Sequence, residues 1–510
     1  MAGRAPVRGT KLCRNYSAVA KLPPTEFQPK KYAGPLWENT EKIKSEHIPP
    51  SVFNFYKKPL LLHQGHKQWL FDHTGRRYLD LLAGVVTVSV GHCHPKVVSA
   101  VKEQMDSLWH TTNIYRHPKL YEYVEKLADK FPGDLKVVYL VNSGSEANDL
   151  AVLLARLYTG NNEILSLQGS YHGYSSGLMG LTSMQSYRLP LLAPSGFHHV
   201  RNLIVTKNYG HFIFLTSFPP VALPAWCAQV PLPDPFRGAW GGCRDSPAQA
   251  PGACSCPGDC VATDNYIHQL KQLLEHSVPV RGVAALFAES IQGGGGTLQF
   301  TKGYLKKAQE LVKNYGGLYI ADEVQTGFGR TGDHFWGFEG HGVTPDIVTL
   351  AKGIGNGFPL AAVVTTRDVA AAHARAAYFN TFGGNPLASA AGKAVLEVIE
   401  EEKLQENCKV VGKYFIEKLK DLQARHSVIG DVRGKGLMLG VELVTPGSKE
   451  PLDNSKVLDI LEATKDMGVL VGRGGKKSNT IRLKPPMCIT KEDVDFSISV
   501  LDEAVRSVMQ

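Results

Sequence analysis

Two short stretches decide the fold: LYIAD at residues 318–322 and IVTLAK at residues 347–352. Each is a continuous apolar run that leads into a charged side chain, Asp322 in the first and Lys352 in the second. Such runs are typical of strands that are buried on both faces of a parallel sheet. In open α/β sheets, ligands bind at the carboxyl ends of the strands. We therefore expect Asp322 and Lys352 to lie at a ligand site on one edge of a sheet.

The same pattern extends outward along the chain. Similar apolar runs lie at 137–141, 164–167, 284–287 and 360–364, and helical spacing separates several of them. This alternation predicts an α/β fold with a mostly parallel sheet that helices cover. From about residue 385 the pattern changes: helical spacing at 388–401 and 408–426 precedes strand-like residues 436–444 and 469–471. A smaller C-terminal α+β domain is expected, and short strands between residues 60 and 90 are candidates to join it.

Composition and charge exclude several classes of protein. With 510 residues, of which 43% are hydrophobic and 20% charged, the chain is not collagen-like, coiled-coil or wholly disordered. The net charge is +9, but seven Lys/Arg residues and one Glu within residues 1–35 supply +6 of it, so the body is nearly neutral. No segment combines a basic stripe with stacking aromatics, and we expect no nucleic-acid partner.

The N-terminus has the composition of a targeting segment. Its first 25 residues contain no acid but several Arg and Lys, as in a mitochondrial transit peptide, and Arg14–Ser17 resembles a processing site. The alternative is a basic disordered tail. We expect residues 1–40 to be a transit peptide and a disordered tail, and the mature protein to lie in the mitochondrial matrix. Since no apolar run reaches about 20 residues, no membrane span is expected.

Four of the nine cysteines, Cys243, Cys254, Cys256 and Cys260, crowd into one Pro/Gly-rich stretch. Four neighbouring thiols could bind zinc. However, the spacing lacks the paired Cys-x-x-Cys knuckles of zinc ribbons, and thiols in a reducing compartment need no partner. The sequence therefore favours a surface loop with free thiols, no metal site and no disulfide framework.

An anion site is predicted where the apolar run 137–141 ends. The turn Asn142-Ser143-Gly144-Ser145 leads into helical spacing over 150–158. Hydroxyl groups, exposed backbone N–H groups and a helix dipole suit a phosphate. Ordinary capping by Ser and Gly is an equally open interpretation of this turn.

Three further features complete a candidate site. Tyr171 and His172 follow the run 164–167 and could stack on a flat heterocycle. Asp322, at the end of a buried strand, needs a positive partner such as a protonated ring nitrogen. Lys352 is poorly hydrated at its strand end, which suits it to Schiff-base chemistry. A phosphate cradle, a stacking aromatic, a buried carboxylate and a strand-end lysine together are what pyridoxal 5′-phosphate requires.

At this point the sequence resembles a known family, the class-III pyridoxal-phosphate aminotransferases. The motifs that carry the resemblance are residues 142–147, 171–173, 321–332, 345–346, 352–353 and 381–386. The resemblance covers about residues 55–505, apart from 189–228. It implies fold type I: a large domain at 91–370 with a mostly parallel seven-stranded sheet, a C-terminal small domain at 371–510, and an N-terminal segment at 41–90 that joins the small domain.

The resemblance also implies roles for individual residues. Lys352 would bind the cofactor covalently and move the proton, and Asp322 would pair with the ring nitrogen. Thr381 would reach the phosphate of the neighbouring subunit's site, which implies a homodimer or homotetramer. Arg482 would hold the substrate α-carboxylate, with Val85 in the substrate pocket. The cofactor contacts implied besides these are Ser143, Gly144, Ser145, Tyr171, His172, Glu289 and Gln325.

Two absences bear on the substrate that the resemblance implies. Related ω-aminotransferases carry a switch glutamate where this chain has Gly294, so Arg482 would stay free for α-carboxylates. They also carry an arginine for 2-oxoglutarate where this chain has Tyr174. A small monocarboxylate acceptor is therefore expected.

Residues 85–95, 243–260, 431–436 and 487–491 resemble the mitochondrial alanine–glyoxylate aminotransferases. We expect a ping-pong reaction in which alanine, with small β-amino acids as further donors, gives its amino group to glyoxylate, yielding pyruvate and glycine. Two alternatives stay open: a phospholyase of the same class that acts on a phosphorylated amine, and a dimer inactivated by residues 189–228. That stretch is long, apolar and foreign to the family, and a long apolar insertion exposes adhesive surface.

Overall fold

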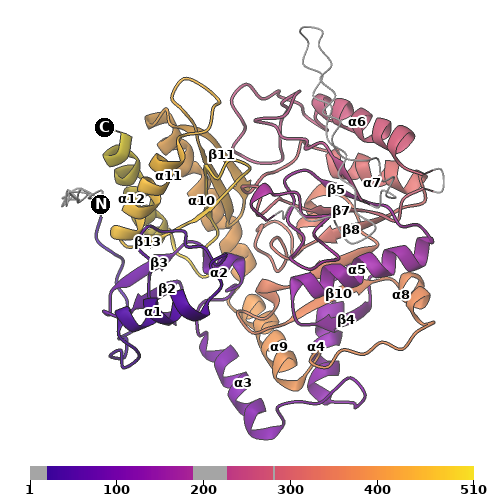
Figure 1. Cartoon of the computed structure of the whole chain (residues 1–510), viewed down its shortest axis with the longest axis horizontal. Helices are drawn as coiled ribbons and strands as arrows, with labels where there is room; N and C mark the ends of the chain where they lie inside the picture. Colours follow the sequence, from indigo (N-terminus) through magenta and orange to yellow (C-terminus); the bar gives the residue numbers. More distant parts are fainter. Residues whose placement is uncertain (1–19, 188–226, 280–281, 510) are drawn as a thin grey trace, which may run out of the picture.

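The computed structural model describes residues 20–187, 227–279 and 282–509, with a seven-stranded sheet at the centre (Figure 1). The strand order is β4-β10-β9-β8-β7-β5-β6. From β9 to β6 neighbouring strands are parallel, whereas β10 runs antiparallel to β4 and β9. This confirms the predicted mostly parallel sheet. The strands are β4 (Val137–Val141), β5 (Ile164–Leu167), β6 (Cys227–Val230), β7 (Ala285–Glu289), β8 (Leu318–Asp322), β9 (Ile347–Leu350) and β10 (Ala361–Thr365).

Both faces of this sheet are buried, which explains its continuous apolar runs. Along β7, Ala285 and Phe287 pack into one apolar cluster, and Leu286 and Ala288 pack into another on the opposite face. Helices α5 (Gly144–Thr159) and α8 (Arg367–His373) cover the first face. The second face is covered by α4 (Pro118–Ala128), α6 (Val261–Ser277), α7 (Tyr304–Asn314) and α9 (Pro386–Glu401).

Two four-stranded sheets make up the smaller part of the molecule. One has the order β11-β12-β15-β14 and the other the order β1-β2-β3-β13. In the second sheet, β13 pairs parallel with β3, so the early strands share a sheet with a C-terminal strand (Figure 1). The strands are β1 (Leu62–His66), β2 (Trp69–Asp72), β3 (Arg77–Asp80), β11 (Ile429–Lys435), β12 (Met438–Leu443), β13 (Val469–Leu470), β14 (Gly472–Gly474) and β15 (Thr480–Leu483).

The remaining helices pack around these sheets or connect them to the large one. They are α1 (Trp37–His47), α2 (Ala83–Val86), α3 (Pro95–Ser107), α10 (Leu404–Arg425), α11 (Asn454–Asp466) and α12 (Lys491–Met509). In the described part of the chain, none of the helices is both long and apolar enough to cross a membrane.

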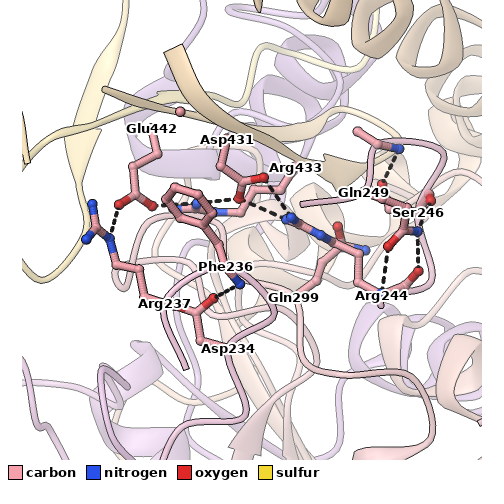
Figure 2. A network of polar contacts seen from close by, with 12 residues as sticks. Asp234, Phe236, Arg237, Arg244, Ser246, Gln249, Gln299, Asp431, Arg433 and Glu442 are labelled. Atoms are coloured by element: carbon pink, nitrogen blue, oxygen red, sulfur yellow. Dashed lines mark hydrogen bonds and ion pairs between the residues drawn. The ribbon is translucent and has the colours of Figure 1, made fainter. Parts of the chain in front are cut away.

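Strand β11 was not predicted, because it carries buried charges in place of an apolar pattern. Asp431 and Arg433 are less than 2% exposed and form an ion pair with each other at 2.9 Å. Figure 2 shows that this pair belongs to a larger network, which joins the loop that carries Arg237 and Arg244 to the sheet that contains β11. Arg244 donates to both oxygens of Asp431, and Arg433 donates to Glu442, which also pairs with Arg237.

The prediction of a disordered N-terminal tail within residues 1–40 is wrong for Ala20 and Phe27, which contact the body of the molecule. The ring of Phe27 stacks on His66 at 4.6 Å and contacts Phe71 at 5.2 Å. Ala20 N donates to Ser499 Oγ, so this segment lies against the body of the molecule. The predicted transit-peptide residues 1–19 lie outside the described residues.

Two other unusual stretches have different outcomes. The apolar stretch 189–228 lies outside the described residues, apart from its end, where β6 begins at Cys227. The cysteine stretch is described: the prediction of free thiols is confirmed for its four cysteines, but the prediction that they lie on the surface is wrong for two of them. Cys243 and Cys260 are buried, and the four sulfur atoms of Cys243, Cys254, Cys256 and Cys260 lie within 4.8 Å of one another.

Candidate active site

The predicted anion cradle is the first turn of α5. Ser143 caps this helix, with its Oγ accepting a hydrogen bond from Glu146 N at 3.2 Å, so the hydroxyl also serves the capping role that the sequence left open. Ser145 Oγ accepts a hydrogen bond from Tyr174 N. A Cβ built at Gly144 would lie 3.4 Å from Ala351 Cβ. The cradle therefore lies directly beside the residue that precedes Lys352.

Asp322 lies at the end of β8 and is 3% exposed. Its Oδ2 is within 2.8 Å of His172 Nδ1 and accepts a hydrogen bond from Asn148 Nδ2 at 3.1 Å. Its Oδ1 accepts a hydrogen bond from Val324 N. These partners fix the carboxylate in one orientation, although the other ring nitrogen of His172 is buried without a partner in the described chain. A fixed, buried carboxylate at a strand end can hold a protonated ring nitrogen.

Lys352 follows β9, with a left-handed backbone (φ 53°) that directs the chain away from the sheet. Burial lowers the pKa of its amine, against the opposing attraction of Asp322 and Glu289. Among the described residues, nothing forms a hydrogen bond or ion pair with Lys352 Nζ. An amine with a lowered pKa and no partner is suited to act as a nucleophile and as a proton carrier.

Glu289 and Tyr171 hold two loops together at the ends of β5 and β7. Glu289 Oε1 accepts a hydrogen bond from Tyr171 N at 3.2 Å, and its Oε2 accepts one from Gly293 N at 2.6 Å. Burial, and then the charge of Asp322, raises the pKa of Glu289. The structure thus places Glu289 under Tyr171, whose ring lies 4.9 Å from that of Tyr187.

Arg482 lies on β15, near enough for its charge to lower the pKa of Lys352. Its Nη1 donates to Gly293 O at 3.3 Å, and its buried Nε has no partner in the described chain. No carboxylate of the described residues pairs with Arg482. A Cβ at Gly294 would lie 2.6 Å from Met184 Sδ, so a glutamate does not fit there without displacing Met184. That Arg482 binds a substrate carboxylate stays a prediction.

The sequence analysis missed two polar residues around this site, Asn148 and Lys484, and the contact that Ser290 makes. Asn148 holds Asp322, and its signal is a polar side chain on the otherwise apolar inner face of α5. Lys484 Nζ donates to Gln325 Oε1 at 3.1 Å; it lies two residues after Arg482, the spacing that places side chains on one face of a strand. Ser290, where the family has proline, donates its hydroxyl to the buried Glu323.

Two further predicted residues, Thr381 and Val85, lie in segments that contact the site; Asn380, next to Thr381, accepts a hydrogen bond from Asn142 Nδ2 at 3.1 Å. Thr381 lies in an exposed stretch, and Phe382 beside it is 61% exposed. Val85 is half-buried in a left-handed turn (φ 59°). The same segment reaches the lysine loop further on, where Ser89 Oγ donates to Gly353 O.

The geometry therefore fits pyridoxal phosphate on four counts: a helix N-terminus beside Ala351, a fixed carboxylate at Asp322, a buried amine of lowered pKa at Lys352 and, within the described residues, a guanidinium nitrogen of Arg482 that has no partner. The sequence profile of the class-III aminotransferases matches residues 54–204 and 249–505. The chain belongs to this family. As a class-III aminotransferase it is a pyridoxal-phosphate-dependent enzyme, and the predicted fold type is confirmed.

Curated relatives of this class-III aminotransferase carry one recurring name. Alanine–glyoxylate aminotransferase 2, mitochondrial, of Homo sapiens is 49% identical over 495 residues, which cover 96% of this chain and 90% of the relative. Alanine–glyoxylate aminotransferase 2 homolog 2, mitochondrial, of Arabidopsis thaliana is 43% identical, with 96% and 92% covered.

Solved structures with the same fold have more varied activities. A phospholyase from Arthrobacter in complex with phosphoethanolamine has 30% identity and a TM-score of 0.77, and the match covers 92% of this chain and 99% of that one. An amine transaminase from an uncultivated Pseudomonas species in the PLP-bound form has 29% identity and a TM-score of 0.75, with 94% and 100% covered. The fold alone therefore does not distinguish transamination from phosphate elimination.

Proposed function

We propose that this aminotransferase transfers the amino group of alanine, and of small β-amino acids, to glyoxylate, producing pyruvate and glycine in the mitochondrial matrix. The names of the curated relatives support both the substrates and the compartment. The observation that carries the proposal is the combination of Arg482, which has no acidic partner in the described chain, with Gly294 beside it. A small α-carboxylate is the partner that this arrangement accommodates.

When bound, pyridoxal phosphate supplies an aldehyde for the amino group and an electron-accepting ring. The N-terminus of α5 would hold its phosphate, because Ser143, Gly144 and Ser145 present N–H groups and hydroxyls there. Asp322, oriented by His172 and Asn148, would keep the ring nitrogen protonated. Gln325 and Tyr171 would contact the ring.

The chain's own residues then control the substrate. Lys352 would take the proton from the substrate Cα, since burial favours its neutral amine. In the second half of the reaction it would return a proton to the Cα of the product. Arg482 would fix the α-carboxylate through two parallel hydrogen bonds, which orients the Cα–H bond toward Lys352. Lys484, whose pKa burial and Arg482 lower well below the usual value, would hold Gln325 in place.

We propose a homodimer, or a tetramer built from such dimers, in which Thr381 completes the partner's phosphate site. Exposed apolar side chains support this assembly, because they gather in two segments that contact each other: the rings of His110 and Phe382 lie 5.4 Å apart. Such a patch marks an interaction surface. Its exposed members are Leu108, Trp109, Ile114, Tyr115, Phe379 and Phe382.

The test of the proposed reaction uses the absorbance of the purified holoenzyme. We expect alanine to bleach the visible cofactor band and glyoxylate to restore it, with pyruvate and glycine formed in equal amounts. Phosphoethanolamine is the comparison substrate, because of the phospholyase relative. If alanine leaves the band unchanged while phosphoethanolamine is consumed with phosphate release, the phospholyase alternative replaces this proposal. Borohydride reduction followed by peptide mapping should place the cofactor on Lys352.

A further inference from the structure

A cluster of four cysteines lies away from the active site, in the loop between β6 and α6. Its members, Cys243, Cys254, Cys256 and Cys260, are all free thiols. Within the cluster, Cys254 Sγ lies 3.3 Å from Cys260 Sγ and 3.4 Å from Cys256 Sγ. With Cys243 included, the four sulfur atoms lie within 4.8 Å of one another. Four thiols from three separate turns of the loop therefore converge on one point.

This arrangement has the dimensions of a tetrahedral metal site. Sulfur atoms at about 2.3 Å from a zinc ion are about 3.8 Å apart along the edges of the tetrahedron. Two disulfides are a poorer match, since S–S bonds of about 2.0 Å would pull the four sulfur atoms into separate pairs. Four thiolate ligands select zinc among the common divalent ions and leave no open position for substrate. The site is therefore structural in kind.

The surrounding backbone supports the cluster in the way that metal-thiolate sites require. Cys243 N donates to Cys260 Sγ at 3.2 Å, which would stabilise a thiolate there. The loop is paired with the segment before α7: Lys302 N donates to Cys243 O, and Cys260 N donates to Lys302 O, each at 2.9 Å. Lys302 Nζ donates to Pro257 O, which brings a positive charge next to Cys256.

We propose that Cys243, Cys254, Cys256 and Cys260 bind one structural zinc ion. The ion would close the loop that carries Arg237 and Arg244. These arginines pair with Glu442 and Asp431 of the small sheet (Figure 2). Arg433 of that network donates to Gly296 O, in the same loop as the Gly293 carbonyl that accepts from Arg482. Zinc would thus stabilise the junction between the large sheet and the side of the site that holds the substrate carboxylate.

The first experiment measures metal in the wild-type holoenzyme, purified under reducing conditions without chelators. We expect one zinc per chain by elemental analysis, released in step with modification of four thiols by a mercurial reagent. After exchange, cobalt should show the visible d–d bands and near-ultraviolet charge-transfer bands of a tetrahedral thiolate complex. Absence of zinc both as purified and after incubation with zinc, or disulfides among these four cysteines, would overturn the proposal.

Variants then assign the ligands. Cys254→Ser and Cys256→Ser should each lose zinc and have a lower melting temperature, and Cys254→His, which keeps a ligand atom, should retain zinc. The control is Cys93→Ser, an exposed cysteine outside the cluster, which should keep one zinc per chain. Retention of stoichiometric zinc by Cys254→Ser would contradict the assignment. Since metal content is read independently of transamination, failure here leaves the proposed reaction untouched.

Discussion

The position of the substrate-binding arginine depends on a glycine next to it. Gly474 on β14 lies against Arg482, and a Cβ at this position would lie 2.8 Å from Arg482 Cδ and 2.9 Å from its Nε. We predict that Gly474→Ala displaces the guanidinium and raises KM for alanine and glyoxylate by about tenfold, equivalent to about 1.4 kcal/mol. Cofactor binding should be unchanged. Steady-state kinetics with both substrates measure this.

The matched control for Gly474→Ala is Gly340→Ala, because a Cβ at Gly340 meets only ordinary contacts at 3.6 Å or more. That variant should keep the wild-type KM. An equal rise in KM in both variants, or an unchanged KM in Gly474→Ala, would show that the close contact with Arg482 does not control substrate binding.

Glu163, just before β5, is expected to make stability depend on pH. It is 5% exposed, and burial raises its pKa to about 7, slightly opposed by Arg156. Because the folded state binds the proton more tightly than the unfolded state, the free energy of unfolding falls as pH rises from about 4.5 through 7. Glu163→Gln should therefore stabilise the protein at pH 8, by about 1 to 3 kcal/mol, but not at pH 5.

Urea unfolding at the two pH values, at one protein concentration, tests this prediction for Glu163. Glu417→Gln, at an exposed position on α10, serves as the control and should show no difference between pH 5 and pH 8. A stabilisation by Glu163→Gln that is equal at both values would mean that its carboxylate ionises normally in the folded protein.

For single residues, the sequence predicted the charged side chains at the strand ends and missed the residues that hold them in place. Asp322 and Lys352 stood out because each interrupts an apolar pattern at a strand end. Asn148 and Ser290 could not be assigned, because their roles come from contacts with residues far along the chain, Asp322 and Glu323. The cofactor contact of Glu289 stays a prediction, and the structure adds that each of its oxygens accepts a hydrogen bond from a backbone N–H group.

Among the structural elements, β11 depends on its buried ions. Burial opposes ionisation of Glu442, but Arg433 and Arg237 outweigh it and lower its pKa. We predict that Asp431→Asn, which leaves Arg244 without a carboxylate, lowers the free energy of unfolding by about 3 to 5 kcal/mol. Thermal and denaturant unfolding of the purified variant measure the loss.

Asp333→Asn is the control for β11, since the Asp333 side chain is 42% exposed and its pairs with Lys409 and Lys435 are long. Its cost should stay below about 1 kcal/mol. Equal losses in the two variants would mean that burial of the network adds nothing to its energetic importance.

The same contrast explains which elements were predictable. Strands of the large sheet are buried on both faces, so apolar runs alone identify β7, β8, β9 and β10. Strand β11 is equally buried, yet it satisfies its charges through Arg244 and Glu442, which lie elsewhere in the sequence. No local pattern contains that information.

For the whole molecule, the proposal of a shared site predicts complementation between subunits. Lys352→Ala should be inactive, and Thr381→Ala should bind pyridoxal phosphate more weakly by about tenfold or more. In a mixed dimer, the chain with intact Lys352 would receive an intact Thr381 from its partner. Differently tagged chains, co-expressed and purified as the mixed dimer, should regain about half of the wild-type activity at limiting cofactor, by the pairing expected for a symmetric dimer.

The control for complementation is the Thr381→Ala homodimer, assayed at the same cofactor concentration. If the mixed dimer has no more than half of that homodimer's activity, Thr381 acts within its own chain or not at all. The family resemblance implied an assembly through Thr381, but the sequence did not indicate the surface involved, since exposed side chains such as Trp109 and Ile114 look like ordinary loop residues until the chain folds.

The parallel pairing of β13 with β3 has a consequence for the order of folding. Leu79 is synthesised about 390 residues before its partner Val469. Because such distant contacts cost much chain entropy to form, they are expected to form late. The edge of β3 therefore has no partner strand until the ribosome has synthesised nearly the whole polypeptide and β13 is available. A chaperone that shields this edge would have its greatest effect on nascent chains, before residue 469 emerges.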